Sequence, residues 1–419
     1  MRIFALLLVV AEALSQAGGA WAEDPSVPLG SPGFRPTLES PFGWRGDGSG
    51  RFPEATPVTN WSATKNVRWS TVVGRSYSSP IITDKLALVT SEPNLVVCVN
   101  RADGKVRWKF AVQPALLADP KSRKIAEDYQ PPKNGSGLAA ATPITDGRNV
   151  FAVFANGIVC AVDLDGKLKW AVGIEAEQNT GYGRSSSPII VAGKLVVHIS
   201  NLYAFDLATG AQLWVNTEVK SSYGTPIVTR VGNIDLIVTP LGDVVRAVDG
   251  TGVNSDIGHT SHSRPIKGGD GVVCFGDSEI HVLRFNEAFK EEEMWNGTVT
   301  GDVIGSPLVH DHTLFITTGE GELFTFDSQG KGSQEPLING QKLFENTNAA
   351  VPAAYASITL AGKHLFLNSN QGETVVLAAT RGAPLVSRNR LPAGTGSSPV
   401  FSGKDMFLRD GDKLFCIGE

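Results

Sequence analysis

The sequence predicts an all-β protein, an eight-bladed β-propeller closed by pairing an N-terminal strand with the C-terminal blade. Three observations lead to this prediction. A motif ending in Pro recurs along the chain, each repeat holds several short apolar runs, and the last repeat has one strand too few. Helical periodicity is nearly absent, whereas repeats of about 40–50 residues with several short strands each are typical of propeller blades.

The recurring motif is a pair of small or hydroxyl residues followed by Pro at the start of an apolar run. Seven copies place Pro at positions 80, 143, 188, 226, 265, 307 and 399. The last step, from 307 to 399, is about twice the others, and Ala353-Ala354-Tyr355 fits a degenerate copy halfway. Eight units therefore span 80 to 399, a mean of (399 − 80)/7, or about 46 residues.

The first unit shows how each repeat is expected to fold. Its sequence, YSSPIITDKLALVTSEPNLVVCVNRADGKVRWKF, occupies residues 77–110. The apolar runs predict four strands, at 80–82, 85–90, 95–100 and 105–110. Pro suits the first residue of a strand because no ladder donor is lost there. The Asn or Asp that opens the turn before the last strand can bond backbone amides, and its closing Gly tolerates positive φ.

Tryptophan recurs four positions after the Gly of that turn. Trp108, Trp170 and Trp214 stand there, and Trp69 lies in a similar run near the N-terminus. A large ring at this position can wedge against the next blade and bury on the order of 200 Å². We therefore predict that Trp69, Trp108, Trp170 and Trp214 dock neighbouring blades.

Two of these stretches resemble a known family. AVDLDGKLKW (161–170) and AFDLATGAQLW (204–214) are similar to the tryptophan-docking repeat of quinoprotein (PQQ) β-propellers. That family includes PQQ-dependent alcohol dehydrogenases and the propeller lipoprotein of the outer-membrane barrel assembly machinery. The resemblance covers roughly residues 40–419. It implies eight blades and does not by itself imply a chemistry.

The two chain ends are predicted to close the ring. The last unit contains SSPVF, DMFLR and KLFCIGE, which supply three strands before the chain stops. Residues 66–69 (NVRW) resemble the missing fourth strand with its Trp. Pairing this segment with the last blade would remove a free sheet edge.

Segments outside the repeats define the remaining organisation. Residues 1–22 resemble a signal peptide, with Arg2, an apolar run from Ile3 to Val10, and a cleavage site after Ala22. We therefore expect export to the periplasm or the extracellular space, without a membrane-spanning segment. Residues 23–40 form a Pro-rich flexible lead-in, 41–419 the propeller, and 113–137 an insertion loop. Residues 44–50 (WRGDGSG) resemble the opening of exported bacterial members and predict a strap across one face.

Composition excludes some functions. A net charge of −5 argues against nucleic acid as a partner, since phosphate binding needs a concentrated basic surface. The four Cys lie singly within apolar runs, at positions 98, 160, 274 and 416. This pattern favours buried thiols in strands, with a disulfide as the alternative, and it lacks the paired spacing of a zinc site.

Residues just before the innermost strands are expected to ring the mouth of the central channel. The candidate ligand-binding residues there are Arg75, Tyr77, Arg184, Tyr223, His262 and Arg264. Their cationic and aromatic character suits an anionic group, a sugar or a peptide. The alternative is that these side chains only pack between blades.

The family's dehydrogenases imply a PQQ cofactor, a calcium ion held by carboxylates, an Asp base and usually an adjacent Cys pair. The sequence has no Cys-Cys, and the predicted mouth stretches contain no Asp or Glu. We therefore expect no catalytic residues, no metal site, and neither PQQ nor calcium.

The leading functional hypothesis is a monomeric, non-catalytic scaffold that binds a protein or a cell-envelope component. The resemblance implies a role in outer-membrane protein assembly. The alternatives are a PQQ-dependent alcohol or sugar dehydrogenase and a carbohydrate-binding propeller.

Overall fold

The structure is a computed structural model that describes residues 27–175, 181–221, 223–253, 266–268, 271–275, 278–345, 352–394 and 396–419. For residues 267, 268 and 271–275 it describes the backbone only. The predicted signal peptide, residues 1–22, lies outside the described residues.

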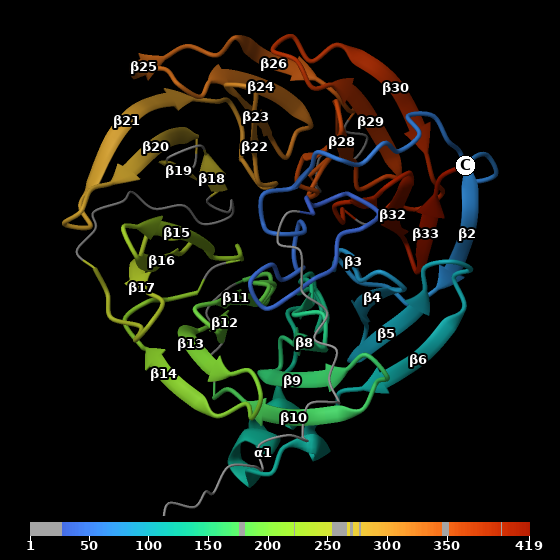
Figure 1. Cartoon of the computed structure of the whole chain (residues 1–419), viewed down its shortest axis with the longest axis vertical. Helices are drawn as coiled ribbons and strands as arrows, with labels where there is room; N and C mark the ends of the chain where they lie inside the picture. Colours follow the sequence, from blue (N-terminus) through green and yellow to red (C-terminus); the bar gives the residue numbers. More distant parts are fainter. Residues whose placement is uncertain are drawn as a thin grey trace, which may run out of the picture.

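Eight β-sheets stand around a central axis, which confirms the predicted eight-bladed propeller (Figure 1). Each blade begins with a short strand beside the axis, and its later strands step outward. The strands of blades 1 to 4 are β3 (Ile81–Ile82), β4 (Leu86–Ser91), β5 (Leu95–Asn100) and β6 (Val106–Ala111); β7 (Ile144–Thr145), β8 (Asn149–Val153), β9 (Ile158–Asp163) and β10 (Leu168–Gly173); β11 (Ile189–Val191), β12 (Lys194–Ile199), β13 (Asn201–Asp206) and β14 (Gln212–Asn216); and β15 (Ile227–Val231), β16 (Ile234–Val238) and β17 (Val244–Arg246).

Blades 5 to 8 complete the ring, and three of their strands come from elsewhere in the chain. These are β25 in blade 5, β1 in blade 7 and β2 in blade 8. The strands are β18 (Ile266–Gly268), β19 (Gly271–Phe275), β20 (Glu279–Phe285), β21 (Glu291–Thr298) and β25 (Gly332–Gln334); β22 (Leu308–His310), β23 (Thr313–Thr317), β24 (Glu322–Asp327) and β26 (Ile338–Lys342); β1 (Arg51–Phe52), β27 (Thr359–Ala361), β28 (His364–Asn368), β29 (Glu373–Ala378) and β30 (Leu385–Arg390); and β31 (Val400–Ser402), β32 (Asp405–Asp410), β33 (Lys413–Ile417) and β2 (Val67–Val72).

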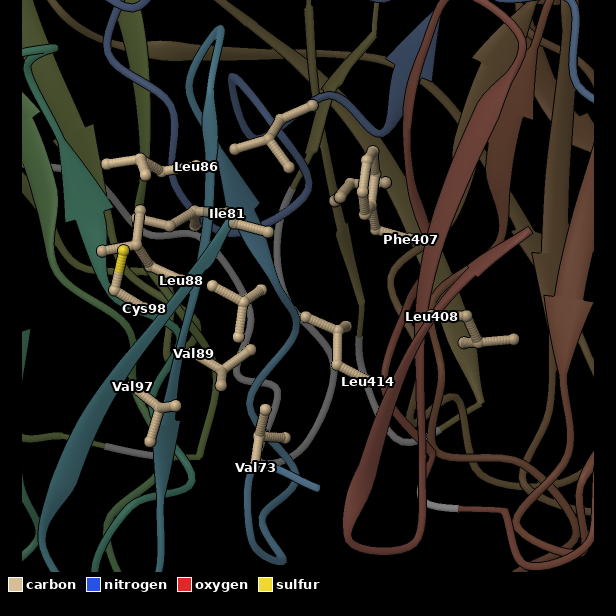
Figure 2. Packing of buried hydrophobic residues seen from close by; sticks show 14 of the residues in the cluster. Val73, Ile81, Leu86, Leu88, Val89, Val97, Cys98, Phe407, Leu408 and Leu414 are labelled. Atoms are coloured by element: carbon tan, nitrogen blue, oxygen red, sulfur yellow. The ribbon is translucent and has the colours of Figure 1, made fainter. Parts of the chain in front are cut away.

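The N-terminal strand closes the ring as the sequence predicts. Strand β2 pairs antiparallel with β33, and Trp69 lies opposite Cys416. The C-terminus accordingly lies beside β2 in Figure 1. A hydrophobic core spans this seam, with Val73, Ile81 and Leu88 packed in one cluster with residues of blade 8 (Figure 2). The seam between the chain ends is thus packed like the interior of the ring.

A buried arginine adds polar contacts at the same seam. Arg409 of β32 is 1% exposed, and its guanidinium donates to the carbonyls of Gly74 and Thr90 of blade 1, both at 2.8 Å. Burial lowers the pKa of Arg409 to about 9, while the nearby Glu92 carboxylate opposes this shift. The closing blade is therefore bound to the first blade by side-chain as well as ladder hydrogen bonds.

The recurring hydroxyl residue before Pro forms hydrogen bonds between neighbouring blades. In each observed link, the backbone N–H of this residue donates to the hydroxyl of the equivalent residue in the next blade, at 2.9–3.0 Å. The links run Ser79 to Thr142, Thr142 to Ser187, Ser187 to Thr225, Ser306 to Ser357, Ser357 to Ser398, and Ser398 back to Ser79. We call these residues the hydroxyl belt. All of them are buried, so each link satisfies an amide that water cannot reach.

The belt corrects the predicted position of the seventh repeat. The sequence placed the degenerate motif at Ala353-Ala354-Tyr355. The hydrogen bonds instead place Ser357 in the belt, so that Ile358 occupies the position held by Pro elsewhere. Blade 7 therefore has the hydroxyl residue of the motif but not its Pro. The fifth blade's belt position, Arg264, lies outside the described residues.

Four tryptophans pack against the turn glycines of the next blade. A Cβ atom on Gly104, Gly166, Gly210 or Gly250 would lie 2.5–2.7 Å from the ring of Trp69, Trp108, Trp170 and Trp214, respectively. Each of these glycines has positive φ, so both the space and the backbone favour Gly. The indole N–H groups of the first three rings also donate to backbone carbonyls of the next blade at 2.8–2.9 Å.

Trp295 makes the same kind of contact in blade 5, which the sequence analysis missed. It is fully buried in β21, its ring stacks on Phe326 of blade 6, and its indole N–H donates to the carbonyl of Ser328 at 3.2 Å. The turn before β21 (286–290, NEAFK) lacks the Asp-to-Gly pattern of the other units. Without that pattern, only the position of Trp295 in the fourth strand of its unit could have identified it.

Residues 27–62, here called the strap, cross one end of the channel. Phe42 pairs with Thr145 of blade 2, while β1 pairs in parallel with β27 of blade 7. Arg45 is fully buried and donates to the carbonyls of Pro307 and Ile358, at 2.9 and 2.8 Å, which belong to blades 6 and 7. Figure 1 shows this blue segment over the centre of the ring. The strap therefore ties together blades far apart in the ring.

The insertion 113–137 packs on the outside of blade 2 and contains a short helix. Helix α1 (Pro120–Asp128) follows the 3-10 turn η1 (Pro114–Leu116), and Asp119 caps α1 by accepting from the backbone N–H of Ser122 at 2.8 Å. A Cβ on Gly173 of β10 would lie 2.5 Å from Ser122, so the helix lies directly on that strand.

Three cysteines are buried free thiols, which confirms the prediction for Cys98, Cys160 and Cys416. Burial raises the pKa of each of these thiols to about 12. They therefore stay protonated and act as small apolar side chains. The side chain of Cys274 lies outside the described part.

We predict that the belt hydroxyls stabilise the ring. Replacing Ser187 by Ala removes the acceptor for the buried N–H of Thr142, and should lower the free energy of unfolding by about 1–3 kcal/mol. The neighbouring Ser186 is a matched control, because its buried hydroxyl has no partner among the described residues. Urea unfolding of both variants tests this, and equal midpoints for Ser187→Ala and Ser186→Ala would contradict it.

A second prediction concerns acid stability. His198 of β12 is buried, and its Nε2 donates to the carbonyl of Lys220 at 3.1 Å. Burial lowers the pKa of His198 from 6.5 to about 4. Between these values only the unfolded chain binds the proton, so stability is retained above pH 6.5 and falls as the pH drops toward 4. The loss should reach about 3 kcal/mol.

Unfolding midpoints measured between pH 7 and 4 test this dependence. His198→Gln should flatten the profile, because Gln does not titrate. The exposed His312, replaced by Asn, should leave the profile as in the wild type. An unchanged profile in His198→Gln would show that other groups cause the acid sensitivity.

Candidate functional site

The two ends of the channel differ. The strap contacts the turns that follow the innermost strands, through backbone bonds at Gly362 and Gly403. The predicted ligand-binding residues instead precede the innermost strands. Because each innermost strand runs along the channel wall, these residues lie at the end opposite the strap. This opposite end is the candidate functional site.

Tyr77 and Tyr355 form the first half of this site. The ring centroids lie 6.1 Å apart at 89°, an edge-to-face contact between blades 1 and 7. Tyr77 is 49% exposed, whereas Tyr355 is half-buried. The backbone N–H of Tyr355 donates to Asn370 at 3.2 Å, and a Cβ on Gly396 would lie 2.9 Å from the Tyr355 Cβ. Asn370 and the close approach of Gly396 thus fix the position of Tyr355, and its ring packs edge-to-face with the exposed ring of Tyr77.

Tyr182 and Tyr223 form the second half. Their centroids are 5.8 Å apart, and the backbone N–H of Tyr182 donates to the phenol oxygen of Tyr223 at 3.2 Å. The Tyr182 carbonyl accepts from the backbone N–H of Ser136, in the insertion, at 2.8 Å. The Tyr182 side chain itself is 59% exposed. The insertion therefore supports the exposed ring through its backbone.

Both pairs belong to segments that precede innermost strands, at the end of the channel opposite the strap. The pKa of Tyr355 is raised first by burial, and then by the nearby phenols of Tyr77 and Tyr182. Four of the six tyrosines in the chain thus gather at one end of the channel. We call Tyr77, Tyr182, Tyr223 and Tyr355 the tyrosine mouth.

The structure separates the predicted ligand-binding residues into four groups, of which Arg184 is described in the next paragraph. Tyr77 and Tyr223 belong to the tyrosine mouth. Arg75 is exposed two residues before Tyr77. His262 and Arg264 lie outside the described residues.

Arg184 has a structural environment. It is 6% exposed, donates to the carbonyl of Ala155 at 2.8 Å, and lies 4.7 Å from the ring centre of Tyr129 in the insertion. Burial lowers its pKa, although the Tyr129 and Tyr203 phenols oppose that shift. In this position Arg184 joins blades 2 and 3 to the insertion, and replacing it would test folding rather than ligand binding.

Two carboxylates at this end accept backbone hydrogen bonds. Glu92 accepts from the N–H groups of Leu138 and Ala139 at 3.1 and 2.7 Å, and burial raises its pKa. Asp410 accepts from the N–H groups of Ala393 and Gly394. Both carboxylates therefore act as connectors between loops.

Metal-binding groups do not assemble in the part of the chain that the structure describes. Within it, no three His, Cys, Asp or Glu side chains are placed so that they could hold one ion. The tyrosine mouth supplies phenol hydroxyls and aromatic rings. These groups suit stacking and hydrogen bonding.

The sequence placed Tyr182 and Tyr355 in the stretches that precede the innermost strands, but did not name them among the candidate ligand-binding residues. Tyr182 lies five residues before Ser187 of the belt, further upstream than the other candidates. Tyr355 was assigned to the motif itself, because the seventh repeat was placed too early. Selecting every tyrosine of those stretches would have included both.

Comparison with known proteins identifies the family. A family model described as "Outer membrane protein assembly factor BamB" matches residues 54–284, more than half of the chain. Two curated relatives carry that same name. The Yersinia pestis protein is 24% identical over 269 residues, and the Moranella endobia protein is 26% identical over 274. Each alignment covers 62% of this chain, and the chain spans 64% of the length of both relatives.

Solved structures show the same fold. BamB from Moraxella catarrhalis has a TM-score of 0.57 at 13% identity, covering 84% of this chain and 97% of its own. The quinohemoprotein alcohol dehydrogenase ADHIIG from Pseudomonas putida has a TM-score of 0.59 at 12% identity, covering 93% of this chain and 80% of its own. At these identities the likeness concerns the fold alone. The sequence match is the more specific finding, and it shows that this protein belongs to the family described as outer membrane protein assembly factor BamB.

Proposed function

We propose that this protein is exported and acts as a non-catalytic binding scaffold in the assembly of outer-membrane proteins. The observation that carries the proposal is the family match over residues 54–284. The two curated relatives are named for outer-membrane protein assembly, which is the origin of the proposed process.

The geometry of the site supports a binding role. The strap covers one end of the channel, while the other end presents the rings of Tyr77 and Tyr182 to solvent. Clustered tyrosines offer large, rigid contact surfaces with a polar tip, as in many binding sites. The carboxylates nearby, Glu92 and Asp410, accept hydrogen bonds from backbone amides. A binding surface accounts for these features more simply than an acid–base site.

Export is part of the proposal. It relies on the signal-peptide pattern of residues 1–22, with cleavage after Ala22. In the described part of the chain, the structure contains no helix with the length and apolar character needed to span a bilayer.

Deleting the gene for this protein in its own organism tests the proposed role in outer-membrane protein assembly. We expect lower amounts of folded outer-membrane β-barrel proteins, measured by heat-modifiable gel mobility of envelope fractions. Re-expression of the wild-type chain should restore them. Unchanged levels after removal would contradict a role in outer-membrane assembly.

We further propose that the scaffold works without PQQ or calcium. The dehydrogenase alternative predicts that the purified chain, supplied with PQQ and calcium, reduces an artificial dye in the presence of alcohols or sugars. We expect no rate above that of the same mixture without protein. Turnover that depends on both the protein and PQQ would replace the scaffold with an oxidoreductase.

A further inference from the structure

The tyrosine mouth presents aromatic rings that are positioned before any ligand arrives. Tyr77 contacts Tyr355 edge-on, and Tyr182 is fixed by the phenol of Tyr223 and by the insertion at Ser136. Yet Tyr77 and Tyr182 remain 49% and 59% exposed, and among the described residues they are the two aromatic members of the set of exposed large hydrophobic side chains. Rings held in this way lose little conformational freedom on binding.

The size of the nearby cavity argues against an enclosed small molecule. A cavity between blades 7 and 8, lined by Asn368, Ser397, Arg409 and Asp410 among others, has room for about one water molecule. Pockets for small ligands are typically on the order of 300–1,000 Å³. This cavity is therefore too small for such a ligand, whereas the exposed rings of Tyr77 and Tyr182 are open to one that lies across the mouth.

The groups exposed around the mouth indicate which kinds of ligand could bind there. Glu92 and Asp410 are occupied by backbone amides, whereas Arg75 is exposed beside Tyr77. Asp302 is exposed at the equivalent position of blade 6, four residues before the belt serine of that blade. Among the described residues, the exposed surface thus combines aromatic faces, phenol hydroxyls and charges of both signs. Aromatic side chains of a polypeptide can meet such rings edge-to-face or stacked, and its backbone carbonyls can accept from the phenols.

We infer that the tyrosine mouth binds extended polypeptide segments that carry aromatic side chains. Aromatic side chains of the segment pack against the exposed rings of Tyr77 and Tyr182. The inference rests on the proposed function, because a factor in protein assembly acts on other polypeptides. It names the ligand class and assigns binding to the face opposite the strap.

Fluorescence anisotropy with the full chain tests the inference. The probe is a labelled 12-residue peptide in which Phe, Tyr and Trp alternate with Ser and Thr, and the comparison peptide has Ala in place of every aromatic residue. The wild type should bind the aromatic peptide and not the Ala peptide. The double variant Tyr77→Ala/Tyr182→Ala should weaken binding about tenfold or more, since two aromatic contacts are lost.

Matched variants separate contact from folding. Tyr77→Phe/Tyr182→Phe keeps both rings and should bind within about threefold of the wild type. Tyr203→Phe changes a buried tyrosine of β13 whose ring stacks on Phe205, and should leave binding unchanged because that ring is not exposed. Equal circular dichroism of all variants confirms that they fold.

Three results would overturn the inference. They are equal affinity for both peptides, unchanged binding in the Ala double variant, and binding of maltohexaose but not peptide, which would assign the mouth to carbohydrate. A double variant that loses peptide binding but restores outer-membrane protein levels would also overturn the assembly role of the mouth, while leaving the proposed function intact. Unchanged levels after removal of the whole chain would overturn the proposed function itself.

Discussion

The hydroxyl belt is the interaction on which the ring depends. In each link a buried backbone N–H of one blade donates to a hydroxyl of the next blade. That N–H therefore has its hydrogen-bond acceptor only when the neighbouring blade is in place. A buried amide without a partner costs about 1–3 kcal/mol. The link from Ser398 to Ser79 joins residues 319 positions apart in sequence, which makes closure of the ring part of the same network.

The outer parts of the blades are joined mainly by the packing of aromatic rings. Indole rings pack onto turn glycines of the next blade, and the indole N–H usually also finds a carbonyl there. Apolar burial supplies most of the attraction between blades, while the hydrogen bonds determine the register. Trp295 shows that the contact tolerates a different turn, because the next blade's carbonyl at Ser328 is still within reach.

The strap makes the two ends of the propeller unequal. It occupies the end formed by the turns after the innermost strands, and Arg45 extends from it to carbonyls of blades 6 and 7. The long insertion instead reaches the opposite end, where it contacts Tyr182 and Arg184. The strap thus covers one end of the channel, while the exposed rings of Tyr77 and Tyr182 lie at the other.

The sequence by itself determined the blade number, the strand order and the closure at β2, because a repeat of local patterns records local geometry. It also placed Tyr77, Tyr182, Tyr223 and Tyr355 in the stretches that precede the innermost strands. Only the tertiary structure decided that Arg184 is a buried connector, that Ser357 belongs to the belt, and that the four tyrosine rings meet in two pairs. Those outcomes depend on which loops of distant blades come into contact. Such contacts are not part of the sequence repeat, so the repeat could not predict them.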